Sequence, residues 1–176
     1  MHAILKMLQG GDRRSIGRSN EVAALVSDQP ELFEVLIAGI NDPDSLVSMR
    51  CADAAEKVTA RHPEYLLPFK HTLIEELSRI RQKEVRWHVA AMLPRLPLTE
   101  NEQQRGFDLL LSYTNDRSSI VKTITMQALA DLAHSHGAYL YSDAVQFMGT
   151  GPVDVRSEQV DFCTAGTYKW LLAGYG

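Results

Sequence analysis

The chain has 176 residues, of which 45% are hydrophobic and 23% charged, and its formal net charge is −4 at pH 7. This composition is typical of a folded globular protein and does not favour a disordered one. The part before residue 134 has 16 basic and 18 acidic residues, and the part after it has 2 and 4. Neither part has the cationic excess that nucleic-acid binding usually requires. We therefore expect no nucleic-acid partner.

Membrane and metal roles are not favoured either. Apolar runs such as Leu109–Leu111 are far shorter than the roughly 20 residues of a membrane-spanning helix. The first residues also lack the basic-then-apolar order of a secretion signal, so we expect a cytoplasmic protein without a membrane partner. Cys51 and Cys163 are too few and too far apart to indicate a disulfide framework or a zinc site. We expect both to be unreactive side chains.

Three segments in the first 133 residues share one pattern: Val47–Ala55, Val85–Leu93 and Val121–Leu129. Each starts with Val, has a cation near its start, and places small or apolar residues seven and eight positions later. The starts are 38 and then 36 residues apart, which fits a repeat of two helices. Because the apolar residues fall on one stripe of a helix, each segment is predicted to be the inner helix of a pair.

An amphipathic partner helix is predicted before each inner helix, at 30–40, 68–80 and 100–113. Asp42 and Asp116 each stand five residues before the starting Val, where a carboxylate can accept free backbone N–H groups. Pro94 removes a backbone donor within the second inner helix. We expect a kink or an early helix end there.

The repeat spacing, the turn aspartate and the Ala/Leu-rich stripe together resemble HEAT repeats over about residues 17–133. The resemblance implies a mainly α fold, a right-handed α–α superhelix of the HEAT-like, armadillo-like solenoid type. Its concave surface would bind a protein partner, and the helical part would be a scaffold without an active site. Two features depart from the pattern: the cation of the first unit is displaced to Arg50, and Ile80 replaces the turn aspartate of the middle unit.

Other residues of the helical part have a structural and a functional interpretation. His88 is isolated in sequence from the other histidines, and we expect a packed or surface histidine rather than a ligand or base. A local basic cluster is interpreted as a solvated helix face: Arg79, Arg81, Lys83 and Arg86. A HEAT-like reader of DNA lesions is disfavoured by the acidic balance of the chain.

After residue 133 the pattern changes to strand and loop signals. One β-prone run, 138–143, ends in Asp143, and a second, 160–164, precedes Lys169. A loop rich in Gly and Pro, 148–152, lies between them. A strand that ends in Asp, a crossover, and a strand that leads into a Lys loop are typical of an α/β fragment.

The order and spacing of several short motifs resemble the class V aminotransferases, a fold-type I pyridoxal-phosphate family that includes cysteine desulfurases and kynureninases. These motifs are 136–138, 143–146, Gly149, 152–155, 160–162 and 169–172. The resemblance implies that Asp143 pairs with the pyridinium nitrogen and that Gln146 hydrogen-bonds the ring hydroxyl. Lys169 matches the lysine that forms the internal Schiff base. Thr167 and Tyr168 lie where contacts to the phosphate or ring can arise.

This chemistry explains the residue types. A nearby anion keeps the ring nitrogen protonated, and a desolvated lysine amine condenses with the cofactor aldehyde. The 26 residues from Asp143 to Lys169 suit two adjacent strand ends that present both groups to one cofactor. Tyr168 before the lysine, rather than His, favours the kynureninase-like and epimerase-like members. Cys163 does not occupy the position of a desulfurase cysteine.

Two functional hypotheses stay open. In the first, the chain is a protein-binding scaffold with a vestigial C-terminal segment, not an enzyme in this form and without a cofactor. In the alternative, it is a fragment of a pyridoxal-phosphate-dependent transferase or lyase in which Lys169 is catalytic. We expect HEAT-like repeats over 1–133 and a truncated transferase-like segment over 134–176. The boundary is expected between 125 and 136, in a helix that suits both parts.

Overall fold

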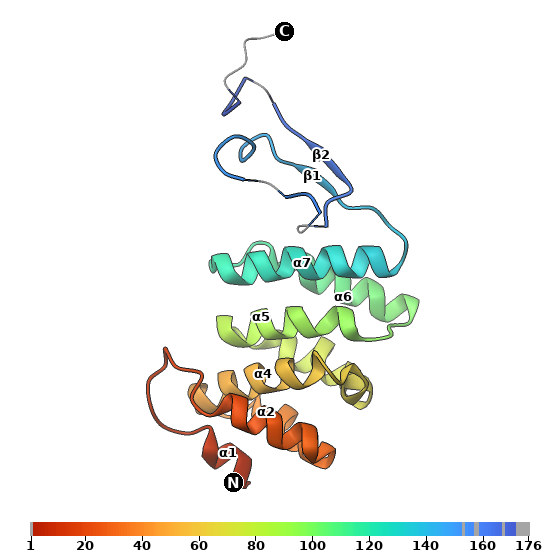
Figure 1. The fold of residues 1–176 in the computed structure, drawn as a ribbon. Coiled ribbons are helices and arrows are strands. Elements are labelled where there is room, and N and C mark those ends of the chain that lie inside the picture. Colours follow the sequence, from red (N-terminus) through yellow and green to blue (C-terminus); the bar gives the residue numbers. More distant parts are fainter. Residues whose placement is uncertain (1, 153, 157–158, 167, 172–176) are drawn as a thin grey trace. The chain divides into compact units, whose positions relative to one another are not determined.

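The computed structural model describes residues 2–152, 154–156, 159–166 and 168–171. The chain divides into two compact units, Met1–Ala128 and Leu129–Gly176, and each is described by itself. Within the described residues the structure is mainly helical and has two short strands (Figure 1). None of the described helices is both long and apolar enough to cross a membrane.

The first unit begins with four α-helices and one 3-10 turn: α1 (Ala3–Met7), α2 (Ser19–Asp28), η1 (Pro30–Leu32), α3 (Phe33–Gly39) and α4 (Ser45–Thr59). Short turns follow: η2 (Pro63–Phe69), the π-turn η3 (Thr72–Glu76) and η4 (Leu77–Arg79). The remaining elements are α5 (Lys83–Met92), η5 (Leu93–Arg95), α6 (Glu100–Tyr113) and α7 (Ser119–Ser135). Helix α7 continues from the first unit into the second.

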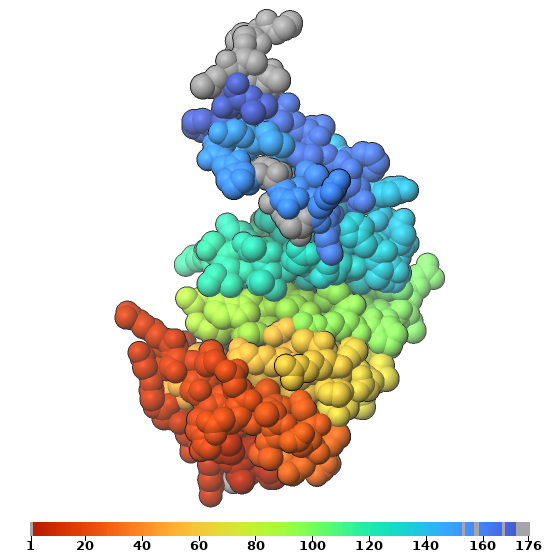
Figure 2. All heavy atoms as spheres, in the orientation of Figure 1, coloured from red at the N-terminus to blue at the C-terminus, as the bar shows by residue number. Residues whose placement is uncertain are grey.

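All three predicted inner helices are observed as helical segments. The first lies in α4, the second spans α5 and η5, and the third lies in α7. Helix α4 packs against both α2 and α5 (Figure 1), and Figure 2 shows the side chains of these helices in close contact on the face drawn. The mainly helical fold is therefore confirmed, whereas the right-handed superhelix stays a prediction.

The proline positions explain where the helices are interrupted. Helix α5 ends at Met92 and gives way to a 3-10 turn that contains Pro94, so the predicted early end is confirmed. The predicted partner helix at 68–80 is helical but is not one continuous α-helix, because 3-10 and π-helical segments make up most of it. Leu73 and Leu77 are nevertheless fully buried, so this segment keeps an apolar packing face.

The turn aspartates form hydrogen bonds with the backbone. Asp42 accepts from the N–H of Asp44 at 2.8 Å, and Asp44 itself caps α4 by accepting from Leu46 at 2.9 Å. Asp116 accepts from the N–H of Ser118 at 2.8 Å. This backbone hydrogen bond, together with the nearby Arg86, lowers the pKa of Asp116. Both aspartates are turn formers, while the cap of α4 is a residue that sequence reasoning passed over.

Arg50 lies in the core of the first unit rather than on a helix face. Its side chain is almost completely buried, and its guanidinium donates to the carbonyl oxygens of Leu8 at 2.7 Å and Gly10 at 2.6 Å. It also donates to the carbonyl of Asp12 at 3.0 Å and twice to that of Ser15 at 3.2 Å. The Arg50 side chain of α4 thus holds the loop between α1 and α2 through hydrogen bonds to the backbone of that loop.

Cys51 follows Arg50 in α4 and is fully buried. Burial raises the pKa of its thiol to about 12. A Cβ atom at Gly39 of α3 would lie 2.6 Å from the Cys51 sulfur, so α3 and α4 approach closely because a glycine stands there. The thiol is packed as a small apolar group between the two helices.

A polar cluster joins α2, α4 and α5. The buried Ser19 hydroxyl hydrogen-bonds to Asp53, whose carboxylate pairs with Lys57 at 2.6 Å and lies 3.8 Å from the Nε2 atom of His88. The His88 side chain is only 13% exposed. Its burial lowers the pKa of His88, although the neighbouring Asp53 acts in the opposite direction. His88 is a packed histidine, as predicted.

This cluster predicts acid sensitivity. The pKa of His88 is lower in the folded state than in the unfolded chain, so the unfolded state binds more protons as the pH falls below about 6.5. The free energy of unfolding should therefore decrease on acidification through this range. Urea unfolding at a series of pH values measures this pH dependence of the free energy of unfolding. His88→Gln should flatten the dependence, and the exposed His71→Gln should not; equal slopes in all three proteins would contradict the prediction.

The second unit contains the end of α7 and a parallel strand pair, β1 (Tyr141–Asp143) and β2 (Phe162–Thr164). Asp161, directly before β2, accepts a hydrogen bond from the N–H of Leu140 at 2.7 Å and lies 2.7 Å from the Nε2 atom of His134 in α7. Both contacts lower the pKa of Asp161, and the hydrogen bond from Leu140 has the larger effect. One carboxylate thus ties the last helical turn and the start of β1 to the start of β2.

Candidate functional site

Asp143 and Lys169 lie at or just after the carboxyl ends of two neighbouring parallel strands. Asp143 is the last residue of β1 and is in register with Thr164, the last residue of β2. Lys169 comes five residues after Thr164. The carboxyl ends of parallel strands lie at one edge of a sheet, where ligands of α/β proteins usually bind. The strand pairing therefore brings the two segments to the same edge.

The turn after β1 carries both Asp143 and Gln146. The Asp143 carboxylate accepts from the N–H of Val145 at 3.1 Å, and the N–H groups of Phe147 and Met148 donate to the carbonyl of Ala144 at 2.9 and 2.8 Å. The backbone after Asp143 is therefore a compact turn. The side chains of Asp143 and Gln146 are both exposed, so their polar atoms stay accessible to a ligand.

Lys169 lies in the segment after β2. Its backbone N–H donates to the carbonyl of Gly166 at 3.4 Å, and its Nζ atom is 5.9 Å from the centre of the Tyr168 ring. Thr167, the remaining predicted contact, lies outside the described residues. The Lys169 side chain is exposed. The residues described around it therefore do not provide the desolvation that the cofactor chemistry calls for.

Two glycines allow the segments after β1 and β2 to approach each other. Gly149 has φ +95°, and a Cβ atom there would lie 2.8 Å from the backbone of Trp170. A Cβ atom at Gly166 would lie 2.9 Å from the Tyr168 ring and 3.2 Å from Val145. Sequence reasoning included Gly149 in a motif but gave it no role. Gly149 lies against the backbone of Trp170, the residue after Lys169, so it helps to position the segment that carries Lys169.

Gly149→Ala should separate the two segments. A left-handed φ costs an L-residue about 1–2 kcal/mol, and overlap with the Trp170 backbone adds a comparable penalty, so we expect a loss of about 2 kcal/mol or more in local stability. Trp170 fluorescence in a Trp87→Phe background would report the change. Gly137→Ala is the control, because Gly137 has φ +69° but nothing within 4 Å of its Cβ position. Equal effects of both substitutions would contradict the proposed contact.

The donor set has the kinds of side chain that pyridoxal phosphate calls for. A carboxylate and an amide come from the turn after β1, and an amine comes from the segment after β2. All three groups are exposed, and so are the nearby aromatic side chains of Phe147 and Tyr168. The residues described at this edge can therefore contact such a cofactor from one side, but they do not enclose it.

Comparison with known proteins adds a second line of observation. The model of the family described as aminotransferase class-V matches residues 109–176. The uncharacterized aminotransferase YcbU of Bacillus subtilis is 34% identical over 80 residues, which cover 44% of this chain and 21% of that protein. The match thus spans about a fifth of the length of this curated relative. No solved structure matches the chain significantly.

The similarity begins within the helical part of the chain. The matched range starts in α6 and includes the whole of α7 as well as β1 and β2. A class V aminotransferase-like region is therefore present, and it contains all five residues predicted to contact the cofactor. The segment predicted as the third inner helix belongs to this region too.

Proposed function

We propose that residues 109–176 are the cofactor-lysine region of a pyridoxal-phosphate-dependent protein of the class V aminotransferase type. The family match over these residues supports the proposal. So does the parallel pairing of β1 and β2, by which Asp143 and the segment that carries Lys169 share one sheet edge. The activity of a complete protein of this kind, a transferase or lyase, is part of the same proposal.

Each residue has a defined task in this proposal. Pyridoxal phosphate, when bound, supplies an electron sink to the reacting substrate. The Asp143 carboxylate holds a proton at the ring nitrogen, and the Gln146 amide donates to the ring hydroxyl. The Lys169 amine would hold the cofactor by condensing with its aldehyde, whose oxygen would leave as water. Thr167 and Tyr168 contact the phosphate or the ring.

The exposure of these side chains limits what this chain does alone. Asp143, Gln146 and Lys169 all face solvent, and hydrogen bonds to exposed groups add little affinity because water competes for them. We therefore expect weak cofactor binding. A full active site needs further residues, either from a longer protein or from a partner subunit.

Covalent labelling tests the role of Lys169. The full chain is incubated with pyridoxal phosphate and reduced with borohydride, and the modified lysines are identified by mass spectrometry. Lys169 should be labelled at lower cofactor concentration than the other lysines, because Asp143 and Gln146 hold the ring beside it. The competing sites are Lys6, Lys57, Lys70, Lys83 and Lys122.

Asp143→Asn separates a bound cofactor from random labelling. Loss of one charge-assisted hydrogen bond should reduce the labelling of Lys169 by about tenfold and leave Lys83 unchanged. Lys169→Ala should remove the preferred site, whereas the control Lys83→Ala should retain it. Equal labelling of all lysines, or an Asp143→Asn protein that labels like the parent, would disprove the role of this site.

We propose a second function for the helical part, that of a protein-binding scaffold whose concave surface contacts a partner. The packing of α4 against both α2 and α5 supports it, because successive helices then form a continuous layer. Deletion of residues 137–176 should leave a helix-dominated circular dichroism spectrum and a cooperative thermal transition. An unfolded deletion variant would contradict an independent scaffold.

A further inference from the structure

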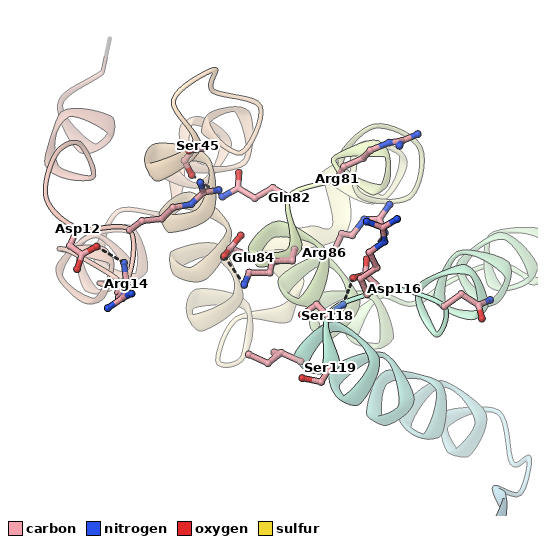
Figure 3. Close-up of a pocket in the computed structure, with 15 residues that line it drawn as sticks. Asp12, Arg14, Ser45, Arg81, Gln82, Glu84, Arg86, Asp116, Ser118 and Ser119 are labelled. Atoms are coloured by element: carbon pink, nitrogen blue, oxygen red, sulfur yellow. Dashed lines mark hydrogen bonds and ion pairs between the residues drawn. The ribbon is translucent and has the colours of Figure 1, made fainter.

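A groove of about 1610 Å³ opens in the first unit (Figure 3). Its walls come from the loop between α1 and α2, the starts of α4 and α5, and the turn before α7. Six cationic side chains line it: Arg13, Arg14, Arg81, Lys83, Arg86 and Arg117. The carboxylates along its walls are those of Asp12, Glu84 and Asp116. Cations therefore outnumber anions by two to one in a chain whose net charge is negative.

Most of these cations are not neutralised within the groove. Arg86 pairs with Asp116 at 2.6 Å (Figure 3). Lys83 lies 3.9 Å from Glu84. In the part of the chain that the structure describes, four guanidinium groups have no carboxylate partner, those of Arg13, Arg14, Arg81 and Arg117. All four are exposed, so they can contact an incoming anion without breaking an internal ion pair.

The start of α5 adds to the positive potential of the groove. Gln82 precedes this helix of ten residues, and its side chain donates to the carbonyl of Ser45 at 3.0 Å instead of capping α5. The first N–H groups of α5 therefore have no side-chain cap. A helix start carries a partial positive charge that favours anions, which here reinforces the arginines.

We propose that this groove binds an acidic peptide segment of a partner protein. The inference rests on the proposed scaffold function. It places the partner's contact at the loops and helix starts that line the groove, rather than on a concave helical surface. Carboxylates of the peptide would meet the four arginines that have no carboxylate partner among the described residues, Arg13, Arg14, Arg81 and Arg117. Arg81, Lys83 and Arg86, interpreted from sequence as a solvated helix face, line this groove.

The size of the groove and the charge of the chain favour a peptide over other anions. Small-molecule pockets measure about 300–1,000 Å³, and this groove is larger and open. A nucleic acid would extend beyond the cationic groove over a surface whose overall charge is negative, which opposes its binding. A short acidic segment confines its charge to the groove.

Fluorescence anisotropy with a labelled peptide of Glu and Gly residues tests the proposal on the full chain. Binding should weaken as salt is raised from about 0.05 to about 0.5 M, because the contacts are electrostatic. The double variant Arg81→Glu/Arg117→Glu should bind about tenfold more weakly. Lys6→Glu/Arg61→Glu makes the same change of charge at exposed residues outside the groove, and it should bind like the parent.

Other outcomes overturn the proposal. Equal loss of binding in both double variants would indicate general charge attraction rather than the groove. A DNA duplex that binds more tightly than the peptide and displaces it would identify a different partner class. Absence of peptide binding by a chain with intact helical circular dichroism would overturn the groove alone, whereas an unfolded 137–176 deletion variant would count against the scaffold. Lys169→Ala should leave peptide binding unchanged.

Discussion

Arg50→Met should lower the free energy of unfolding of the helical part by about 3 kcal/mol or more. The guanidinium is buried and donates to four backbone carbonyls of the loop between α1 and α2, and a buried acceptor left without a donor costs about 1–3 kcal/mol. Methionine fills much of the volume but cannot donate. Urea unfolding followed by circular dichroism measures the loss.

The loop should be released before the helices unfold. Trypsin should therefore cleave Arg50→Met faster after Arg13 and Arg14, which lie in the loop that Arg50 holds. Arg18→Met is the control, because Arg18 is exposed and, among the residues that the structure describes, forms its ion pair with Glu21 alone. It should leave the unfolding midpoint and the cleavage rate nearly unchanged. Equal cleavage rates in the parent and in Arg50→Met would disprove the tethering role of Arg50.

Phe33→Ala should destabilise the helical part by about 3–5 kcal/mol, the usual range for removing a buried aromatic side chain. Phe33 of α3 is 2% exposed, and its ring meets those of Tyr65 and Phe69 edge to face with centres 5.7 Å apart. These contacts join α3 to the 3-10 helix η2. Thermal and urea unfolding both measure the effect.

Phe107→Ala provides a matched control for this prediction. Phe107 lies in α6 and is 41% exposed, so its removal deletes the same atoms but leaves no closed cavity. We expect a loss well below that of Phe33→Ala. Phe33→Ala and Phe69→Ala should also be less than additive in the double variant, since both remove the same ring contact. Additive losses would count against the shared contact.

Helix α7 links the two proposed functions. Val121 and Thr125 are fully buried in the first unit, and His134 near its end contacts Asp161 in the second. The class V aminotransferase-like match includes this entire helix. A substitution in α7 can therefore affect both parts, so variants for the cofactor test are better placed after residue 140 and variants for the groove before residue 119.

Local patterns predicted the elements that depend on nearby residues. The helix expected at 100–113 is observed at the same bounds, because Thr99 and Glu102 form a capping box at its start and its apolar residues follow a helical period. Pro94 ended α5 as expected, since a missing N–H acts within one turn. The two strand signals also correspond to β1 and β2.

Long-range contacts decided what these patterns could not predict. Arg50 binds carbonyls 35 to 42 positions away, and a window of neighbouring residues carries no signal for such a contact. Gly149 is needed because the backbone of Trp170 approaches it, which depends on how two loops pack. The groove combines residues near 13, 81 and 117, whose side chains meet only after the helices pack. Motif order alone identified the candidate cofactor residues, whereas the parallel pairing of two strands brought their segments to one edge.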